Sequence, residues 1–290
     1  MSQDKILPGT YINFVSVASA SSVLSDRGIA TMPLELDWGK EGEVFEVSNE
    51  DFQKDSQKIF GYAHDHEKMN GLSDLFMNAK TLYAYRLNGG GTKATNAFAT
   101  ALYGGTRGND IKIVIQANAD ETSKYDVMTY LETARVDTQT VAQASELVAN
   151  DYVTFKSDAA LEVTAGTALA GGTNATVDGT AHQKYLDKIE SYSYNVMGVI
   201  TTDETTKKLY AAFSKRMRDE QGVKFQLVLY NLKADYLGVI NLNNKVLDTG
   251  VSEASLIYWV TGAECGCEVN KSCQNKQYDG AFEVDTDYTQ

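Results

Sequence analysis

One stretch, residues 194–230, decides the fold: YNVMGVITTDETTKKLYAAFSKRMRDEQGVKFQLVLY. It begins with an apolar, β-prone run, 194–200, and ends with a second one, 223–230. Between them, Leu209, Phe213 and Met217 recur at i, i+4 and i+8, the spacing of one stripe on a helix. Two such runs joined by a helix predict parallel strands connected by a right-handed crossover.

The predicted helix carries signals at both of its ends. Thr201 to Glu204 has the form of a capping box, in which the first and last side chains satisfy free backbone amides. Gly222 is typical of a helix stop. The stretch is therefore predicted to be one complete strand–helix–strand unit.

Alternating helix and strand patterns continue on both sides of this unit. Ser48 and Asp51 favour a helix start, with Gly61 as its stop. Strands are predicted at 30–38, 43–47 and 81–87, and helices at about 51–60, 70–78, 180–191 and from Ser252 through Trp259 to about Ala263.

Residues 104–172 differ from their surroundings. Short β-prone runs at 111–117, 125–136, 152–156 and 161–164 are joined by Thr, Ala and Gly. We therefore predict an α/β (α+β) multidomain chain: a mixed-sheet α/β core with a small, mainly β domain inserted into it. The expected divisions are an N-terminal arm at 1–22, a core at 23–103 plus 173–290, and the insert at 104–172.

The predicted arm is apolar and β-prone from Ile6 to Val17, is broken at Pro8-Gly9, and runs into small residues up to Ser22. This pattern does not resemble the first strand of a closed core. It is typical of a strand lent to a neighbouring molecule.

The composition narrows the function classes. Of the 290 residues, 43% are hydrophobic and 22% charged, which is sufficient for a packed core. The net charge of −13 argues against non-specific nucleic-acid binding. The segment 76–106 nevertheless carries three basic and no acidic side chains. Such unevenness fits either a self-complementary surface or ordinary surface charge.

Compartment signals are few. The first residues have no charged region followed by an apolar run, so we expect no signal peptide, and no apolar run is long enough to span a bilayer. The three cysteines, Cys265, Cys267 and Cys273, are odd in number and clustered, so a secreted disulfide framework is not expected. These features predict synthesis in a reducing cytoplasm.

Motifs that carry chemistry are incomplete. His64 and His66 flank an aspartate, but the third histidine, His182, is distant, so a solvated helix start is favoured over a zinc site. The cysteine cluster has no fourth ligand nearby. The run 89–93, Gly-Gly-Gly-Thr-Lys, lacks the spacing of a phosphate-binding loop. We therefore expect no catalytic residue, cofactor or metal.

Four places together resemble the contractile phage tail-sheath family. They are Leu7-Pro8-Gly9-Thr10-Tyr11-Ile12-Asn13-Phe14 with the 27–30 region; 101–111, a stretch with Gly104, Gly108 and Asn109 that looks like the family's Gly-x-x-Gly-Asn element; Leu169-Ala170-Gly171-Gly172-Thr173; and 270–272 with 278–280. Each motif is short, but their order and spacing extend over nearly the whole chain. The resemblance is closest to compact sheaths of defective prophages and of R-type, diffocin-like bacteriocins of Gram-positive bacteria.

The resemblance implies a structural protein and no enzyme. Sheath subunits polymerise as stacked hexameric rings around an inner tail tube, and the sheath contracts to drive the tube through a target envelope. The implied partners are therefore further copies of the chain and the tube protein, without nucleic acid or membrane insertion. The implied location is a phage tail or tail-like particle made in the bacterial cytoplasm.

By the same resemblance, the arm joins neighbouring subunits by strand addition. Ile12 and Phe14 would lie on one face of the added strand, and Tyr11 and Val15 on the other. The glycines and asparagine of the two Gly-rich elements would be structural: Gly104, Gly108, Asn109, Gly171 and Gly172.

The chain departs from the family's pattern at one point. Family members continue past the Tyr278 region with a further domain and arm, whereas this sequence stops at Gln290. By itself it is therefore expected to be a monomer or weak oligomer. Two other interpretations stay open: a non-sheath α/β small-molecule-binding protein, suggested by the unit at 194–230, and an adhesion module, suggested by the β-rich insert.

Overall fold

The structure, a computed structural model, describes residues 27–287. A six-stranded mixed sheet, in the order β12-β11-β10-β1-β3-β2, forms the larger of its two units. Five neighbouring strands are parallel, and β2 is antiparallel to β3 at one edge. The strands are β1 (Ile29–Leu34), β2 (Val44–Ser48), β3 (Thr81–Arg86), β10 (Val196–Val199), β11 (Gln226–Tyr230) and β12 (Val239–Leu242).

The order of the parallel strands is doubly wound. From the inner strand β1 the chain moves to β3 on one side, and later to β10, β11 and β12 on the other side. This reversal places a topological switch point between β1 and β10. The segment 194–230 forms the β10–α4–β11 part of this pattern, and its two strands pair in parallel as predicted.

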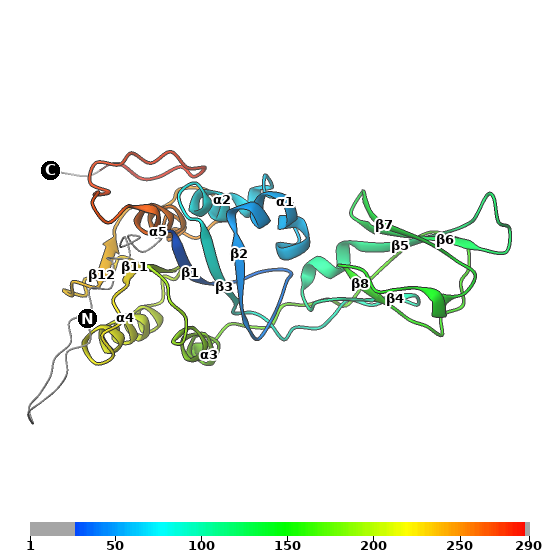
Figure 1. Cartoon of the computed structure of the whole chain (residues 1–290), viewed down its shortest axis with the longest axis horizontal. Coiled ribbons are helices and arrows are strands. Elements are labelled where there is room, and N and C mark those ends of the chain that lie inside the picture. Colours follow the sequence, from blue (N-terminus) through cyan, green and yellow to red (C-terminus); the bar gives the residue numbers. More distant parts are fainter. Residues whose placement is uncertain (1–26, 288–290) are drawn as a thin grey trace, which may run out of the picture.

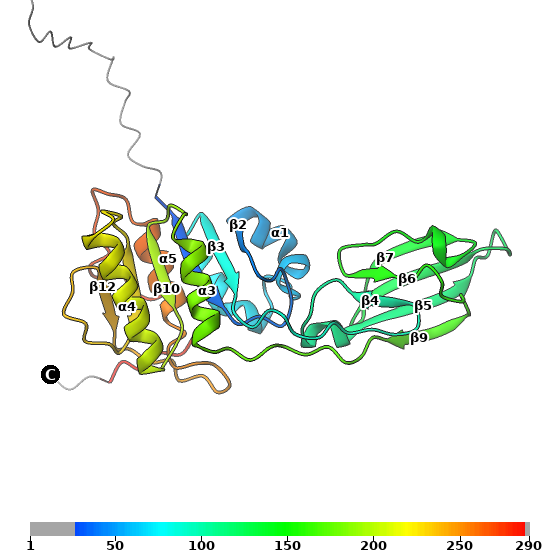
Figure 2. The same ribbon diagram turned by 90° about the horizontal axis from the view of Figure 1, so that it is seen from below.

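Helices cover both faces of the sheet (Figures 1 and 2). On one face lie α3 (Gly179–Ile189) and α4 (Glu204–Asp219), and on the other lie α1 (Asn49–Phe60), α2 (Asn70–Phe76), which follows the short helix η1 (Glu67–Met69), and α5 (Ile257–Gly266). Alternate strand residues enter the two cores: Val228 packs with α1, α2 and α5, while Leu227 and Leu229 pack with α3 and α4. The sheet is thus buried on both sides.

Local sequence accounts for the helix ends. The side chain of Ser48 accepts a hydrogen bond from the Asp51 amide, Asp51 accepts one from the Ser48 amide, and Gly61 ends α1 with a φ of 84°. The capping box predicted at Thr201–Glu204 is wrong. Asp203 caps α4 instead, accepting from the Thr206 amide, because a short carboxylate reaches that amide directly.

The second unit is a β-sandwich formed by a four-stranded antiparallel sheet, β7-β6-β5-β9, and a two-stranded sheet, β4-β8. Both sheets contribute side chains to one apolar core. Its elements are β4 (Ala99–Ala101), η2 (Thr106–Asp110), β5 (Ile111–Ala117), β6 (Tyr125–Leu131), β7 (Ala134–Val141), η3 (Ala144–Glu146), β8 (Val153–Phe155) and β9 (Thr164–Ala168). The predicted fold class, a mixed-sheet α/β core with an inserted β domain, is confirmed.

Several predicted elements differ in detail. The predicted run 125–136 is a hairpin, because Glu132 takes a left-handed φ of 55° and reverses the chain without glycine or proline. The strand predicted at 161–164 begins at Thr164 and continues to Ala168. The sequence analysis missed β4, which pairs with β8 although it lies ahead of residue 104.

Two differences lie near the end of the chain. The short strand β12 was missed, since its four residues follow an irregular connection. The helix predicted from Ser252 begins at Ile257, because the Ser252 hydroxyl accepts from the Ala254 amide and holds a turn there.

The buried sheet gives a direct stability prediction. Leu227 of β11 is fully buried, whereas Leu237 is 86% exposed. Leu227→Ala should lower the free energy of unfolding by about 2–5 kcal/mol, because it removes buried methyl groups and leaves a cavity. The matched change Leu237→Ala should alter it by less than about 0.5 kcal/mol. Urea unfolding measures both, and equal effects would contradict the assigned strand register.

Candidate functional site

The chain passes twice between the two units, once after β3 and once before α3, and these passages form a neck (Figure 1). The Gly-rich elements singled out in the sequence meet there. Asn109 accepts a hydrogen bond from the Gly172 amide at 2.8 Å and donates one to the Gly172 carbonyl at 2.9 Å. One side chain therefore joins two backbone segments that are far apart in the sequence.

The glycines allow this close approach. A Cβ atom on Gly104 would lie 2.4 Å from the Gly91 carbonyl oxygen, and one on Gly172 would lie 2.4 Å from the Gly105 carbonyl oxygen. Gly108 packs against Ala94 and Ala101, and Gly171 has a φ of 83°. Any side chain at Gly104 or Gly172 would push the backbones of the neck apart.

A buried arginine, which the sequence analysis missed, lies at the end of β3. Arg86 is 1% exposed. Its guanidinium donates to the carbonyls of Gly39 at 3.2 Å and Gly104 at 2.8 Å, and to the side chains of Asn88 and Asn174 at 3.2 Å each. Burial lowers the pKa of Arg86, opposed by the charges of Glu41 and Asp37. The cation is satisfied by four oxygen acceptors from separate loops, which fixes those loops relative to one another.

Asp37 adds an acidic counterpart. Its carboxylate accepts from the Asn174 side chain at 2.9 Å, the Tyr62 hydroxyl at 2.9 Å and the Thr106 hydroxyl at 3.1 Å, and it pairs with Lys68. Partial burial by itself would raise the pKa of Asp37. The hydrogen bonds and the Lys68 charge outweigh burial and hold this pKa well below its ordinary value.

Two side chains dock the β-sandwich onto the larger unit. Trp38 belongs to a loop of the larger unit but packs in the sandwich core, with its ring 5.2 Å from that of Tyr103 and 6.3 Å from that of Tyr152. Arg107, 5% exposed, donates to the Gly61 carbonyl at 2.7 Å and stacks over the Tyr62 ring. The neck is therefore a packed, hydrogen-bonded joint.

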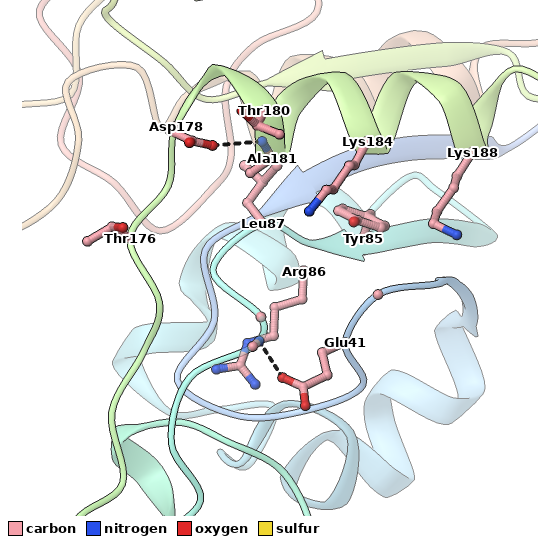
Figure 3. Close-up of a pocket in the computed structure, with 13 residues that line it drawn as sticks. Glu41, Tyr85, Arg86, Leu87, Thr176, Asp178, Thr180, Ala181, Lys184 and Lys188 are labelled. Atoms are coloured by element: carbon pink, nitrogen blue, oxygen red, sulfur yellow. Dashed lines mark hydrogen bonds between the residues drawn. The ribbon is translucent and has the colours of Figure 1, made fainter.

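A cavity of about 610 Å³ opens beside the neck. Figure 3 shows Lys184 and Lys188 reaching from α3 toward Tyr85, with Glu41 approaching from the loop before β2. The lining carboxylates serve the fold: Glu41 accepts from the Gly90 amide and Asp178 caps α3. A second cavity, of about 900 Å³, lies at the switch point and is lined by residues after β1 and β10.

The outer edge of β12 pairs with no strand in the described part of the chain. Val239 and Ile240 are half-buried, and the preceding Leu237 is largely exposed. An unpaired edge with apolar side chains can accept a further strand by backbone hydrogen bonding. This edge, the opposite edge at β2 and the neck are features of the described fold that could serve an assembly.

The remaining candidates are placed as follows. The arm residues Tyr11, Ile12, Phe14 and Val15 lie outside residues 27–287. His66 begins η1, where its side chain accepts from the Lys68 amide. Among residues 27–287, no group of three or more potential ligands could hold a metal ion, and no helix is long and apolar enough to cross a membrane.

Comparison with known proteins covers nearly the whole chain. The "Tail sheath protein Gp18 domain III N-terminal region" matches residues 27–87, the "Phage tail sheath protein beta-sandwich domain" matches 89–174, and the "Phage tail sheath protein central domain" matches 175–290. The matched β-sandwich begins ahead of the boundary expected at residue 104, consistent with the position of β4.

Individual relatives agree with these matches. The Phage-like element PBSX protein XkdK of Bacillus subtilis is 35% identical over 97% of this chain and 66% of its own length, and the uncharacterized protein YqbK of the same bacterium is 34% identical over the same shares. The sheath tail protein of Desulfitobacterium hafniense superposes with a TM-score of 0.84 at 39% identity, covering 97% of this chain and 68% of that one. A sheath tail protein of Listeria innocua gives 0.76 at 35% identity, covering 91% and 62%.

These matches define a structural component of phage tails. The chain belongs to the phage tail sheath protein family, with homologues in phage-like elements of Gram-positive bacteria, and it is a structural protein and not an enzyme. It spans about two thirds, 66%, of the length of the curated relatives that it matches.

The neck predicts a pH dependence of stability. Because the pKa of Asp37 is lower in the folded chain than in the unfolded chain, its stabilising effect is full above the unfolded pKa, about 3.9. The effect is lost as pH falls through the folded pKa. Asp37→Asn should therefore lower stability at pH 7 and flatten the fall of stability below about pH 5.

Urea unfolding at several pH values from 7 down to 3 measures this effect. Asp55→Asn is the matched control, since the Asp55 side chain is exposed on α1, outside the neck, and makes no hydrogen bond with another side chain or backbone group among residues 27–287. The control should keep the wild-type profile. Identical profiles for Asp37→Asn and the control would show that Asp37 does not stabilise the neck.

Proposed function

We propose that this chain is the structural subunit of a contractile tail sheath, which polymerises as stacked hexameric rings around an inner tube. Contraction of that sheath would drive the tube through a target envelope. The observation that carries the proposal is the family match over residues 27–290, joined to an open sheet edge and an apolar N-terminal segment. The partners are further copies of the chain and the tube protein.

Strand addition is the proposed link between copies. The N-terminal segment 6–17 is apolar and β-prone, and the outer edge of β12 offers backbone groups that no strand within 27–287 uses. On the added strand, Ile12 and Phe14 would lie on one face of the extended sheet and Tyr11 and Val15 on the other. Such a link tolerates reorientation of the bodies, because the backbone hydrogen bonds stay intact while the connecting chain bends.

The surface charges support a contact in which one face of a subunit meets the opposite face of the next copy. The helices α3 and α4 expose Lys184, Lys188, Lys208 and Lys215, and none of them forms an ion pair with another described residue. The opposite face carries the C-terminal segment with Asp279, Glu283, Asp285 and Asp287. Contacts between unlike surfaces repeat in one direction and can build rings or helices.

The neck supports contraction by rigid-body movement. Arg86, Asp37, Arg107 and Trp38 fix the β-sandwich to the larger unit through buried contacts. A subunit of this kind would move as one body while its interfaces repack. The particle would be a phage tail or tail-like structure assembled in the bacterial cytoplasm.

Two aspartates in the arm should abolish assembly without unfolding the subunit. In the double variant Ile12→Asp, Phe14→Asp, carboxylates replace the side chains that would be buried against the neighbouring sheet. The double variant Ala149→Asp, Ser191→Asp adds the same charge at exposed positions outside β12 and its flanking loops and is the matched control.

Negative-stain electron microscopy with the tube protein present is the measurement. It compares the 290-residue chain with a version extended to the full length of its relatives. Rings or tubes should form from the extended wild type and the control, and not from the arm variant. Absence of any ordered polymer from every version would overturn the proposed function, and polymer from the arm variant would overturn the role of the arm.

A further inference from the structure

Three thiols gather where α5 ends. Cys265 is fully buried in the core beneath the sheet, and its sulfur donates to the Gly262 carbonyl at 3.3 Å. Cys267 is the residue that ends the helix, and it is half-buried. Cys273 is also half-buried, and all three are reduced in this structure.

A turn brings Cys273 back to Cys267. The Lys271 amide donates to the Glu268 carbonyl at 3.0 Å, which reverses the chain directly after the helix. The sulfur of Cys273 then donates to the Ala263 carbonyl at 3.3 Å, one helical turn before Cys267. The Cys267 side chain is near enough to help raise the pKa of Cys273. The two sulfurs thus share the end of one helix.

We propose that Cys267 and Cys273 are a redox-sensitive dithiol, which closes into an intramolecular disulfide when the chain meets a low-molecular-weight disulfide. The fold holds both residues at the end of α5, and the exposed turn between them can adjust to let the two sulfurs bond. Cys265 is excluded from this pair because its sulfur points into the apolar core.

The reaction proceeds by two exchanges that balance in atoms and electrons. The thiolate of Cys267 attacks one sulfur of the reagent disulfide, forms a mixed disulfide and releases one reagent thiolate, which takes up a proton. Cys273 then loses its proton to solvent and attacks the Cys267 sulfur, releasing the second reagent molecule as a thiol. The protein loses two hydrogens and two electrons, and one reagent disulfide becomes two thiols.

The surroundings favour this order of attack. Burial, with the hydrogen bond to Cys267 and the nearby Glu264 carboxylate, raises the pKa of Cys273 to about 12. The thiolate is the nucleophile, so Cys273 is the poorer first attacker. Once Cys267 is in the mixed disulfide, its thiol hydrogen bond is lost, and the Lys276 ammonium is near enough to favour the Cys273 thiolate.

The disulfide would fasten the root of a surface strap, residues 276–285. The strap crosses α2 and α5, where Asp74 accepts from the Tyr278 hydroxyl at 2.7 Å and from the Ala281 amide at 2.9 Å. Trp259 of α5 donates to Asp279 at 2.8 Å. Between Cys267 and the strap the described contacts are mostly turns and exposed side chains, so oxidation would stiffen this weakest part.

The test uses the reduced 290-residue chain treated with glutathione disulfide under native conditions and then freed of reagent, and only the portion used for peptide mapping is alkylated. Titration of free thiols in denaturant should fall from three to one, and the intact mass should fall by two hydrogens. Trypsin cleaves after Lys271, so the disulfide should appear as two peptides joined through Cys273. Thermal unfolding should shift upward by about 2–5 °C and return when dithiothreitol is added.

Variants separate the three cysteines. Cys265→Ala should still lose both remaining thiols, which assigns the bond because Cys265 and Cys267 share one tryptic peptide. Cys273→Ser should keep a glutathione adduct on Cys267 because no second thiol resolves it, whereas Cys267→Ser should keep both remaining thiols free. In the wild type, three thiols after treatment, a lasting glutathione adduct, a bond to Cys265, or a bond between two chains would each overturn the proposal. Fragmentation of the joined wild-type peptides between Cys265 and Cys267 decides which of the two holds the bond, even if a variant does not fold.

Discussion

A parallel sheet must be covered on both faces, and the rest of this molecule follows from that constraint. Each parallel connection needs a crossover, and the crossovers here place α1 and α2 on one face and α3 and α4 on the other. The chain starts on an inner strand, β1, and builds outward in both directions, so the last strand added, β12, is left at an edge. Because both faces are closed, a neighbouring chain can extend the sheet only at an edge.

The inserted sandwich exploits the crossover between β3 and β10. A crossover is a connection of flexible length, so a whole domain can be placed in it without altering the sheet. Two connecting segments alone would act as a hinge and would leave the inserted domain free to move. Arg86 opposes such a movement. A buried cation needs hydrogen-bond acceptors on every side, and those of Arg86 come from both passages and from the loop after β1. Arg86 can therefore be buried with its hydrogen bonds satisfied only when the sandwich is in this position.

The sequence predicted most of the fold but only part of the neck. Helices with a clear apolar period, such as 204–219, and helix ends with capping residues, such as Ser48 and Gly61, can be predicted because they depend on neighbouring residues in the sequence. The three-residue strand β4 and the four-residue β12 are too short for a period, and their pairing partners are set by tertiary packing. Asn109 was found through its glycine neighbours, whereas Asp37, Arg86 and Asn174 carry no local signal, since they meet only in the folded chain.

The neck is stiff and the edge of β12 is compliant, and this difference would suit a contractile lattice. The neck concentrates buried polar contacts, so a deformation there would leave a guanidinium or a carboxylate without partners. The edge of β12 has no strand partner among residues 27–287, and three of its four side chains are half-buried, so a strand bound there can tilt with little loss of burial. In a lattice of such subunits, movement would concentrate in the linking strands because the bodies resist it. The energetics of this chain therefore favour stiff subunits that are joined to one another by compliant strands.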